Sequence, residues 1–345
     1  MKTVGEFGTG WGEHDRRTMF KRSEEDLIGT ARGHLMIPCF RPFDFLTAPN
    51  QPLTFLSSAS SRVSVEALRG TQSCFHRNVD FDSLFFQWAG ETHYETEFGL
   101  CSTTPGTLTL IPSGIAHRAT GSGDCLRMAV ALSEPLEVLV GEDRHIGRTE
   151  YRVNWENGPQ WPLPKSDQPR AGKVIESLHT WDDGPGEQTL IERDYGRLVG
   201  SAGEGRRIQN LRLFDIFTEI TGVRGPGPVS MRNSRFFVEC YNTTGAQFMF
   251  HRGNRSEEFQ FQFAGTADNI SEFGRDLMEP GDLAIVRRGI SHRVIGSPNF
   301  RRFNLYSHDP WKLLIDPAHP ARKTRFQVQE TVIEAAPWRS AIQAP

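Results

Sequence analysis

The chain has 345 residues, and its 39 lysine and arginine residues nearly balance 42 aspartate and glutamate residues, for a formal net charge of -3. This balance gives no large basic surface for nucleic acid. No apolar run approaches the roughly 18 residues of a membrane-spanning helix. The N-terminal sequence MKTVGEFGTGWGEHDRR lacks the apolar core of a secretory signal, and the five cysteines are scattered without a CxxC pair. We therefore expect a cytoplasmic protein with reduced thiols, and a length of this kind favours two domains.

Short segments with alternating apolar residues dominate the chain, separated by many of its 33 glycines and 21 prolines. In chain order they predict strands at 82–90, 106–112, 126–132, 234–241, 257–265 and 281–287. Helical patterns are predicted only at 64–70 and 311–316. This density of short strands between turn residues predicts an all-β sandwich or barrel.

The chain contains an internal repeat. Residues 76–121 align without a gap with residues 251–296, and 17 of the 46 positions are identical. Chance does not produce this agreement at one fixed offset, so the sequence predicts two copies of one β domain. Each copy has two histidines at the same interval, His76 and His117 in the first and His251 and His292 in the second.

Two histidines at this interval, with a carboxylate between them, are a candidate metal site. A Pro-Gly turn precedes the last strands of each copy, and antiparallel pairing across it can bring the second histidine beside the first. Two imidazoles and one carboxylate on one side of a metal form the facial triad typical of non-haem iron(II). A single histidine on a strand is more often a satisfied polar residue, and shared ancestry alone would also preserve the pairs.

These motifs resemble the cupins, a family of double-stranded β-helix (jelly-roll) barrels. Their first motif reads G-x5-H-x-H-x(3–4)-E-x6-G, and Glu258-x6-Gly265 fits its end, with His251 at the first histidine and Gly253 at the second. Their second motif, G-x5-P-x-G-x2-H, fits residues 106–117, and it fits residues 281–292 with Arg287 in place of proline. The resemblance implies two cupin barrels from an internal duplication, that is, a bicupin.

The run HRNVDFDSLFF, with the later TEFG and IPSGIAHR, is similar to the homogentisate 1,2-dioxygenase family of ring-cleaving dioxygenases. That resemblance implies an Fe(II) site in the C-terminal cupin, with His251, Glu258 and His292 as ligands; Mn, Ni or Zn are not excluded. It implies a substrate that is a hydroxylated aromatic of the homogentisate, gentisate or catechol type, with O2 as the second reactant. Gln260, Gln262 and Arg293 are the candidate catalytic residues, because they would contact substrate beside the metal.

The acidic pair before the phenylalanine strand leaves two candidate ligands. Strand alternation puts Glu257 on the face of Phe259 and Phe261, and Glu258 on the face of the glutamines. If the phenylalanines line the barrel, Glu257 is the ligand; the spacing to Gly265 favours Glu258.

The first copy is expected to have lost its metal. Ser83 stands where the second copy has Glu258, and serine is a poor ligand for a divalent ion. His76, Asp82 and His117 are then a vestigial second site, in which Asp80 or Asp82 could still supply the carboxylate.

The expected domains are an N-terminal cupin with an arm at 1–150, a connector at 151–190 and a C-terminal cupin at 191–345. Two other functions stay open. One is a metal-dependent lyase, decarboxylase or isomerase acting on a small acid or sugar, since cupins host many reactions. The other is a non-catalytic bicupin that binds a small molecule. A homo-oligomer is an open expectation, and partners other than a small aromatic substrate and O2 are not expected.

Overall fold

The computed structural model describes residues 3–8, 16–20, 37–72, 75–96, 99–139, 175–179, 188–192, 209–212, 229–241, 245–246, 250–316 and 322–323. Within these ranges the chain forms strands and one 3-10 turn, η1 (Pro42–Phe45), and no α-helix. No helix in the described ranges is long and apolar enough to cross a membrane. The predicted all-β fold is confirmed.

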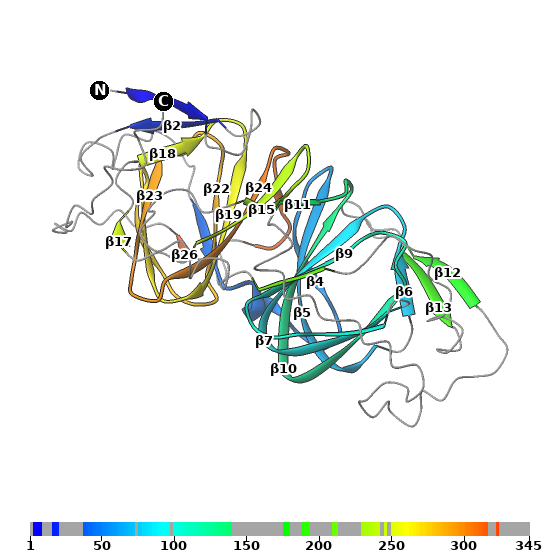
Figure 1. Ribbon diagram of the computed structural model, residues 1–345. Coiled ribbons are helices and arrows are strands. Elements are labelled where there is room, and N and C mark those ends of the chain that lie inside the picture. Colours follow the sequence, from blue (N-terminus) through cyan, green and yellow to red (C-terminus); the bar gives the residue numbers. More distant parts are fainter. Residues whose placement is uncertain are drawn as a thin grey trace. The chain divides into compact units, whose positions relative to one another are not determined.

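The chain divides into two compact units. The C-barrel unit contains Met1–Asp44, Glu137–Val140 and Phe214–Pro345, and the N-barrel unit contains Phe45–Leu136 and Gly141–Leu213. Figure 1 shows the strands of each unit curving around an interior.

Two antiparallel sheets build the C-barrel unit. The first runs in the order β1 (Thr3–Gly8), β2 (Arg16–Phe20), β18 (Phe250–Gly253), β23 (His292–Gly296), β20 (Ala267–Ser271) and β21 (Gly274–Met278), with β17 (Gly245–Ala246) on β23. The second runs β11 (Glu137–Val138), β15 (Val229–Arg232), β16 (Phe236–Tyr241), β24 (Arg301–Ser307), β19 (Glu257–Ala264), β22 (Leu283–Val286), β3 (Pro38–Phe40) and β26 (Arg322–Lys323). β25 (Lys312–Leu313) follows β24 in the chain.

In the N-barrel unit the strands join into one sheet, because two long strands continue from one side of the barrel to the other. These are β7 (Asp82–Thr96) and β10 (His117–Leu132), which pair with each other along most of their length. The sheet runs β12 (Ile175–His179), β13 (Gln188–Glu192), β6 (Phe75–Asn78), β10, β5 (Ser61–Thr71) and β4 (Leu53–Ser57). β7 also pairs with β8 (Gly99–Thr103) and β9 (Thr107–Ile111), and β14 (Gln209–Arg212) pairs with β9.

The duplication is wider than the sequence motif. At the offset that places position 76 on position 251, β6 corresponds to β18 and β8 to β21, residue for residue. β7 covers the positions of β19 and β20 together, and β10 covers those of β23 and β24. Gly90 and Gly265 occupy equivalent bends with φ of 62° and 64°. A Cβ at either glycine would lie 2.7–2.9 Å from backbone atoms of Cys125 or Phe300, so both copies require glycine there.

The predicted strands are confirmed, and the two predicted helices are wrong. Residues 64–70 lie within β5, which pairs with β10 from Ser61 to Thr71 and buries Val65 and Leu68 completely. Lys312 and Leu313, in the second predicted helix, form β25. In the first case, pairing with a neighbouring strand overrides a weak local preference for helix.

The predicted domain boundaries need correction. The N-terminal arm belongs to the C-barrel unit, where β2 pairs with β18 and β3 pairs with β22. Conversely, β12 and β13 fall in or beside the predicted connector, and β14 in the predicted C-terminal cupin, yet all three belong to the N-barrel unit. Hydrogen bonding between strands, which sequence order does not reveal, decides this assignment.

The N-terminal arm (β1–β3) and the segment β12–β14, which we call the second arm, are copies of each other. Met19 of β2 lies opposite His251 in the C-barrel unit, and Leu190 of β13 lies opposite His76 in the N-barrel unit. When position 19 is aligned with position 190, Thr18 matches Thr189, and Arg41-x-Phe43-Asp44 matches Arg212-x-Phe214-Asp215. Each arm therefore precedes one barrel in the sequence and completes the other.

The alternation of β19 separates a packing face from an interior face. Phe259 and Phe261 are fully buried and contact Trp311 and Phe43 edge-on, with ring centroids 6.0 and 6.2 Å apart. The residues between them point to the other face, where Gln260 bonds to Asn269 of β20 in the opposite sheet. The polar face of β19 therefore lines the interior between the two sheets of the C-barrel unit.

Candidate metal centre

Three ligand side chains meet in the interior of the C-barrel unit. His251 comes from β18, Glu258 from the start of β19 and His292 from the start of β23, and one ligand atom from each lies within 4.8 Å of the others. His251 and His292 are opposite each other in the ladder, with ring centroids 4.3 Å apart. All three side chains are buried, with 2–6% of each residue exposed. Among the described residues this is the only such group of histidine, cysteine, aspartate or glutamate side chains.

The orientation of His292 suits a metal ligand. Its Nδ1 lies 3.2 Å from the carbonyl oxygen of Ile290, which only accepts hydrogen bonds, so Nδ1 carries the proton. In the neutral ring Nε2 then presents a lone pair, 3.1 Å from Oε2 of Glu258. Two acceptors this close repel unless a proton or a cation lies between them. A divalent cation resolves the contact, and a carbonyl that holds Nδ1–H is a common support for a ligating histidine.

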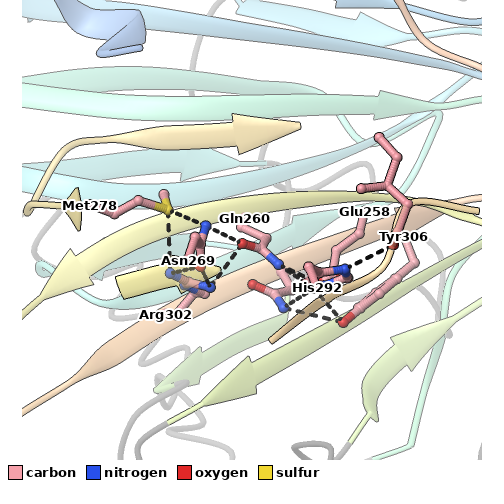
Figure 2. Close-up of polar contacts among 9 residues, drawn as sticks. Glu258, Gln260, Asn269, Met278, His292, Arg302 and Tyr306 are labelled. Atoms are coloured by element: carbon pink, nitrogen blue, oxygen red, sulfur yellow. Dashed lines mark hydrogen bonds and ion pairs between the residues drawn. The ribbon is translucent and has the colours of Figure 1, made fainter. Parts of the chain in front are cut away.

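The two oxygens of Glu258 have different surroundings. Oε1 accepts three hydrogen bonds, from Gln260 Nε2 at 2.9 Å, Asn304 Nδ2 at 2.8 Å and the Tyr306 hydroxyl at 2.9 Å. Figure 2 shows Gln260 and Tyr306 beside Glu258. Oε2 faces His292 instead. The arrangement therefore fixes the carboxylate and leaves Oε2 as the oxygen that would bind a metal.

Behind this shell lies a second polar layer, also drawn in Figure 2. Arg302 Nη1 donates to Oε1 of Gln260 at 2.9 Å and to Oδ1 of Asn269 at 3.1 Å, and Asn269 Nδ2 donates to the same Gln260 oxygen at 2.9 Å. These bonds determine the amide orientation of Gln260, so its Nε2 points toward Glu258 and lies 3.4 Å from Nε2 of His292. Met278 Sδ closes the layer with contacts to Asn269 and Arg302.

The structure separates the two candidate glutamates. Glu257 Oε2 accepts hydrogen bonds from Arg287 at 2.6 Å and from the backbone N–H of Trp311 at 2.9 Å. Its carboxylate is therefore engaged on the phenylalanine face, away from the histidines. Arg287, which replaces the proline of the second cupin motif, is the cation that balances it.

Two of the three candidate catalytic residues do not reach the cluster. Gln260 contacts it directly, as described. Gln262 makes its hydrogen bonds elsewhere: its amide donates to the carbonyls of Ala264 and Gly265 and accepts from Arg302. Arg293 follows His292 in the same strand, so it points to the opposite face, where it packs over the Phe250 ring at 4.9 Å. The expectation that Gln262 and Arg293 contact substrate is therefore corrected.

Gly253 stands where the cupin motif has its second histidine. A Cβ there would approach the carbonyl oxygen of Ser256 to 2.9 Å, a distance that side chains do not tolerate without a backbone shift. The missing ligand is thus accompanied by a local geometry that has no room for it.

The equivalent position in the N-barrel unit has the histidines without the carboxylate. His76 and His117 pair in the ladder, with ring centroids 4.1 Å apart. Ser83 accepts a hydrogen bond from Asn78 at 2.8 Å. Asp82 instead receives the backbone N–H of Ser113 at 2.8 Å on the other face, so the predicted vestigial set of His76, Asp82 and His117 is not brought together.

The sequence interpretation missed Asn269, Asn304, Tyr306 and Arg302. A signal for three of them was present in residues 302–306, where arginine, asparagine and tyrosine alternate with Phe303 and Leu305. That alternation predicts one polar interior face on β24. Asn269 had no comparable signal, because only the pairing of β20 with β23 brings it to the interior.

Comparison with known proteins gives structural similarity at low sequence identity. No family model matches the chain, and no curated protein does. A salicylate 1,2-dioxygenase structure from Pseudaminobacter salicylatoxidans is 11% identical with a TM-score of 0.45, over 84% of this chain and 91% of that one. A cupin 2 conserved barrel domain protein from Leptotrichia buccalis is 7% identical with a TM-score of 0.43, over 81% and 99%. Oxalate decarboxylase from Bacillus subtilis is 12% identical with a TM-score of 0.39, over 83% and 80%.

The assignment of fold rests on this chain's own features. Each copy has the glycine-bounded motifs, a pair of histidines facing each other from neighbouring strands, and antiparallel strands that curve around an interior. Together they describe two β barrels of one kind joined in one chain, the arrangement that the resemblance to the cupins implies.

Proposed function

We propose that the C-barrel unit binds a divalent metal through His251, Glu258 and His292. The observation that carries the proposal is the pair of facing acceptors, His292 Nε2 and Glu258 Oε2, 3.1 Å apart with Nδ1 already bonded to a carbonyl. A divalent cation shared with His251 would offset the repulsion between these two facing acceptors. The three donors on Glu258 Oε1 fix the carboxylate for this role.

We further propose that the metal is Fe(II) and that the protein is a dioxygenase that opens the ring of a hydroxylated aromatic. Two histidines and one carboxylate form the donor set of non-haem iron(II) oxygenases, which leave positions open for other molecules. Iron bound there would supply the redox centre at which the aromatic and O2 react. The ring-cleaving assignment is supported by the sequence similarity of the HRNVDFDSLFF region and its companion motifs to that family.

The residues around the triad have defined tasks in this proposal. Gln260, held by Arg302 and Asn269, presents an N–H beside His292 and can donate to an oxygen of a bound substrate. Tyr306 stacks on Phe237 with centroids 4.3 Å apart and planes 9° apart, so its hydroxyl stays on Glu258. The low exposure of all these groups keeps bulk water from the metal position.

Anaerobic purification followed by elemental analysis, then O2 uptake with homogentisate, gentisate and catechol, tests the proposal. We expect about one iron per chain and O2 uptake with at least one of the three phenols. Metal without O2 uptake would favour the alternative of a metal-dependent lyase, decarboxylase or isomerase. A protein that binds no metal under these conditions would favour a non-catalytic binding bicupin.

A further inference from the structure

The interior of the N-barrel unit has lost four large side chains. At positions that the internal repeat makes equivalent, the C-barrel unit has Glu239, Glu258, Asn304 and Tyr306, and the N-barrel unit has Ser64, Ser83, Ala129 and Ala131. The four small residues are neighbours in the sheet, because Ala129 lies opposite Ser64 and Ala131 lies opposite Ser83. The replacements therefore reduce the side-chain volume along one continuous part of the barrel wall, which in the other unit includes the phenol ring of Tyr306.

Solvent reaches the part of this region around Ser64 and Ala129, whereas Ser83 and Ala131 are buried. Ser64, His76, Phe85 and Ala129 are all partly exposed, whereas their equivalents Glu239, His251, Gln260 and Asn304 are buried, at 0–4% exposure. The alternate residues of the same strands, which point to the packing face, stay buried: Val63, Val65, Met128 and Val130 are 0–1% exposed. Around Ser64 and Ala129 the exposed positions are therefore on the interior face, as expected for a barrel interior that small molecules can reach.

The polar groups of this interior are arranged for an uncharged ligand. Nδ1 of His117 lies 2.9 Å from the Ile115 carbonyl oxygen, so it carries the proton, and burial lowers the pKa of His117 to about 4. The ring is therefore neutral, and its Nε2 has no hydrogen-bond partner among the described residues. A buried acceptor of this kind is rare in native proteins unless a ligand, ion or water meets it.

Two cations face this interior. Arg62 lies opposite Ala131 with its guanidinium over the Phe81 ring, 5.6 Å from the centroid, and Arg127 is compensated by its neighbours. Arg127 donates through Nε and Nη2 to Oε2 of Glu66, at 3.0 and 2.7 Å, and through Nη1 to the Tyr94 hydroxyl at 3.0 Å. Its guanidinium lies over the Phe85 ring, 4.7 Å from the centroid. Phe85 and the two alanines offer apolar contact, and Ser83 replaces the carboxylate that a divalent metal would require.

We infer that the N-barrel unit holds a second, metal-free binding site for an uncharged, single-ring molecule that carries a hydroxyl group. Its hydroxyl donates to Nε2 of His117, and its ring lies against Phe85 in the space beside Ala129 and Ala131. His117 itself is only 1% exposed, so the ligand enters past the half-buried residues to reach it. Burying an apolar ring and satisfying one buried acceptor provide the affinity.

Calorimetric titration of the metal-stripped full-length protein with four small probes tests the inference. Benzyl alcohol is expected to bind, toluene about tenfold more weakly because it lacks the donor, and benzoate least, because its charge would be buried without compensation. Tighter binding of benzoate than of benzyl alcohol would overturn the uncharged ligand and point to Arg62, which lies opposite Ala131, as an anion anchor. Phenol is the fourth probe, and it should behave like benzyl alcohol.

Variants locate the site. Ala129→Asn combined with Ala131→Tyr introduces the side chains of the other unit and should abolish benzyl alcohol binding, while His117→Leu should weaken it about tenfold. His292→Ala, in the C-barrel unit, is the matched control and should bind as the unaltered protein does. Unchanged binding in both N-barrel variants, each with a cooperative melting curve, would overturn the site, as would loss of binding in His292→Ala. Two metal ions per chain after reloading would overturn its metal-free character.

Discussion

Replacing Tyr306 with phenylalanine tests the proposed metal centre most selectively. The change removes one of three hydrogen bonds to Glu258 Oε1 and keeps the ring, which stacks on Phe237 at 4.3 Å. A hydrogen bond to a charged group contributes about 1.5–3 kcal/mol, which corresponds to roughly a 10- to 150-fold change in affinity. Loss of a group that supports a metal ligand typically costs about 10–100-fold in metal affinity. We therefore expect Tyr306→Phe to weaken metal binding by about 10–100-fold.

Competition for Co(II) or Zn(II) against a chromophoric chelator measures this affinity without requiring turnover. Tyr94→Phe is the matched control, since Tyr94 is also fully buried but lies in the N-barrel unit with its hydroxyl on Arg127. It should leave the metal affinity unchanged. An unchanged affinity in Tyr306→Phe, or an equal loss in Tyr94→Phe, would refute the idea that Tyr306 fixes the ligating carboxylate.

Three further predictions concern the two histidine pairs and the two glutamates. His292→Ala should remove bound metal and activity, whereas His117→Ala should keep about one metal per chain; equal loss from both, by elemental analysis, would mean two working sites. Glu258→Ala should abolish activity and lower metal affinity by more than about 100-fold. Glu257→Ala should keep the metal but lower the melting temperature, because it breaks the partly buried ion pair with Arg287; the reverse result would exchange the roles of the two glutamates. Burial lowers the pKa of His117 to about 4 in the folded state. Between the ordinary histidine pKa and about pH 4, the unfolded chain therefore protonates this residue and the folded protein does not. Stability should thus fall as the pH drops across this window, by up to about 3 kcal/mol, and denaturant unfolding of His117→Leu should lack this component.

The fold could be predicted from the sequence because each motif occurs twice in the chain at the same spacing. The same interval between histidines in both copies indicated which strands pair, and the pairings of His76 with His117 and of His251 with His292 are both present. Alternation in β19 placed Glu257 and Glu258, the two candidate carboxylate ligands, on opposite faces of the strand. It did not indicate which face lines the interior. That depended on Trp311 and Phe43, which cover the phenylalanine face from distant parts of the chain.

The errors have a common physical origin. Gln262 was a candidate because it shares the strand face of Glu258, and Arg293 because it is an arginine directly after a ligand. In a strand, however, the residue next to a ligand faces away from it, and Gln262 is engaged by backbone carbonyls at a bend. The domain boundaries were wrong for a related reason, because short arm strands have little sequence signal and their partners lie elsewhere in the chain.

Because each arm pairs with the barrel farther along or farther back in the chain, the order of synthesis determines when each barrel can finish folding. Phe20 of β2 pairs with Phe250 of β18, so the first arm leaves the ribosome long before its partner exists. At roughly 5–20 residues per second, the roughly 230 residues between them take on the order of 10–50 s, during which the strand edges of the arm stay open to other chains. The first barrel likewise stays unfinished until β13 and β14 emerge. A chain cut in two between 150 and 174 would give fragments that each contain one barrel and the arm of the other, so each fragment should fold fully only when its counterpart is present.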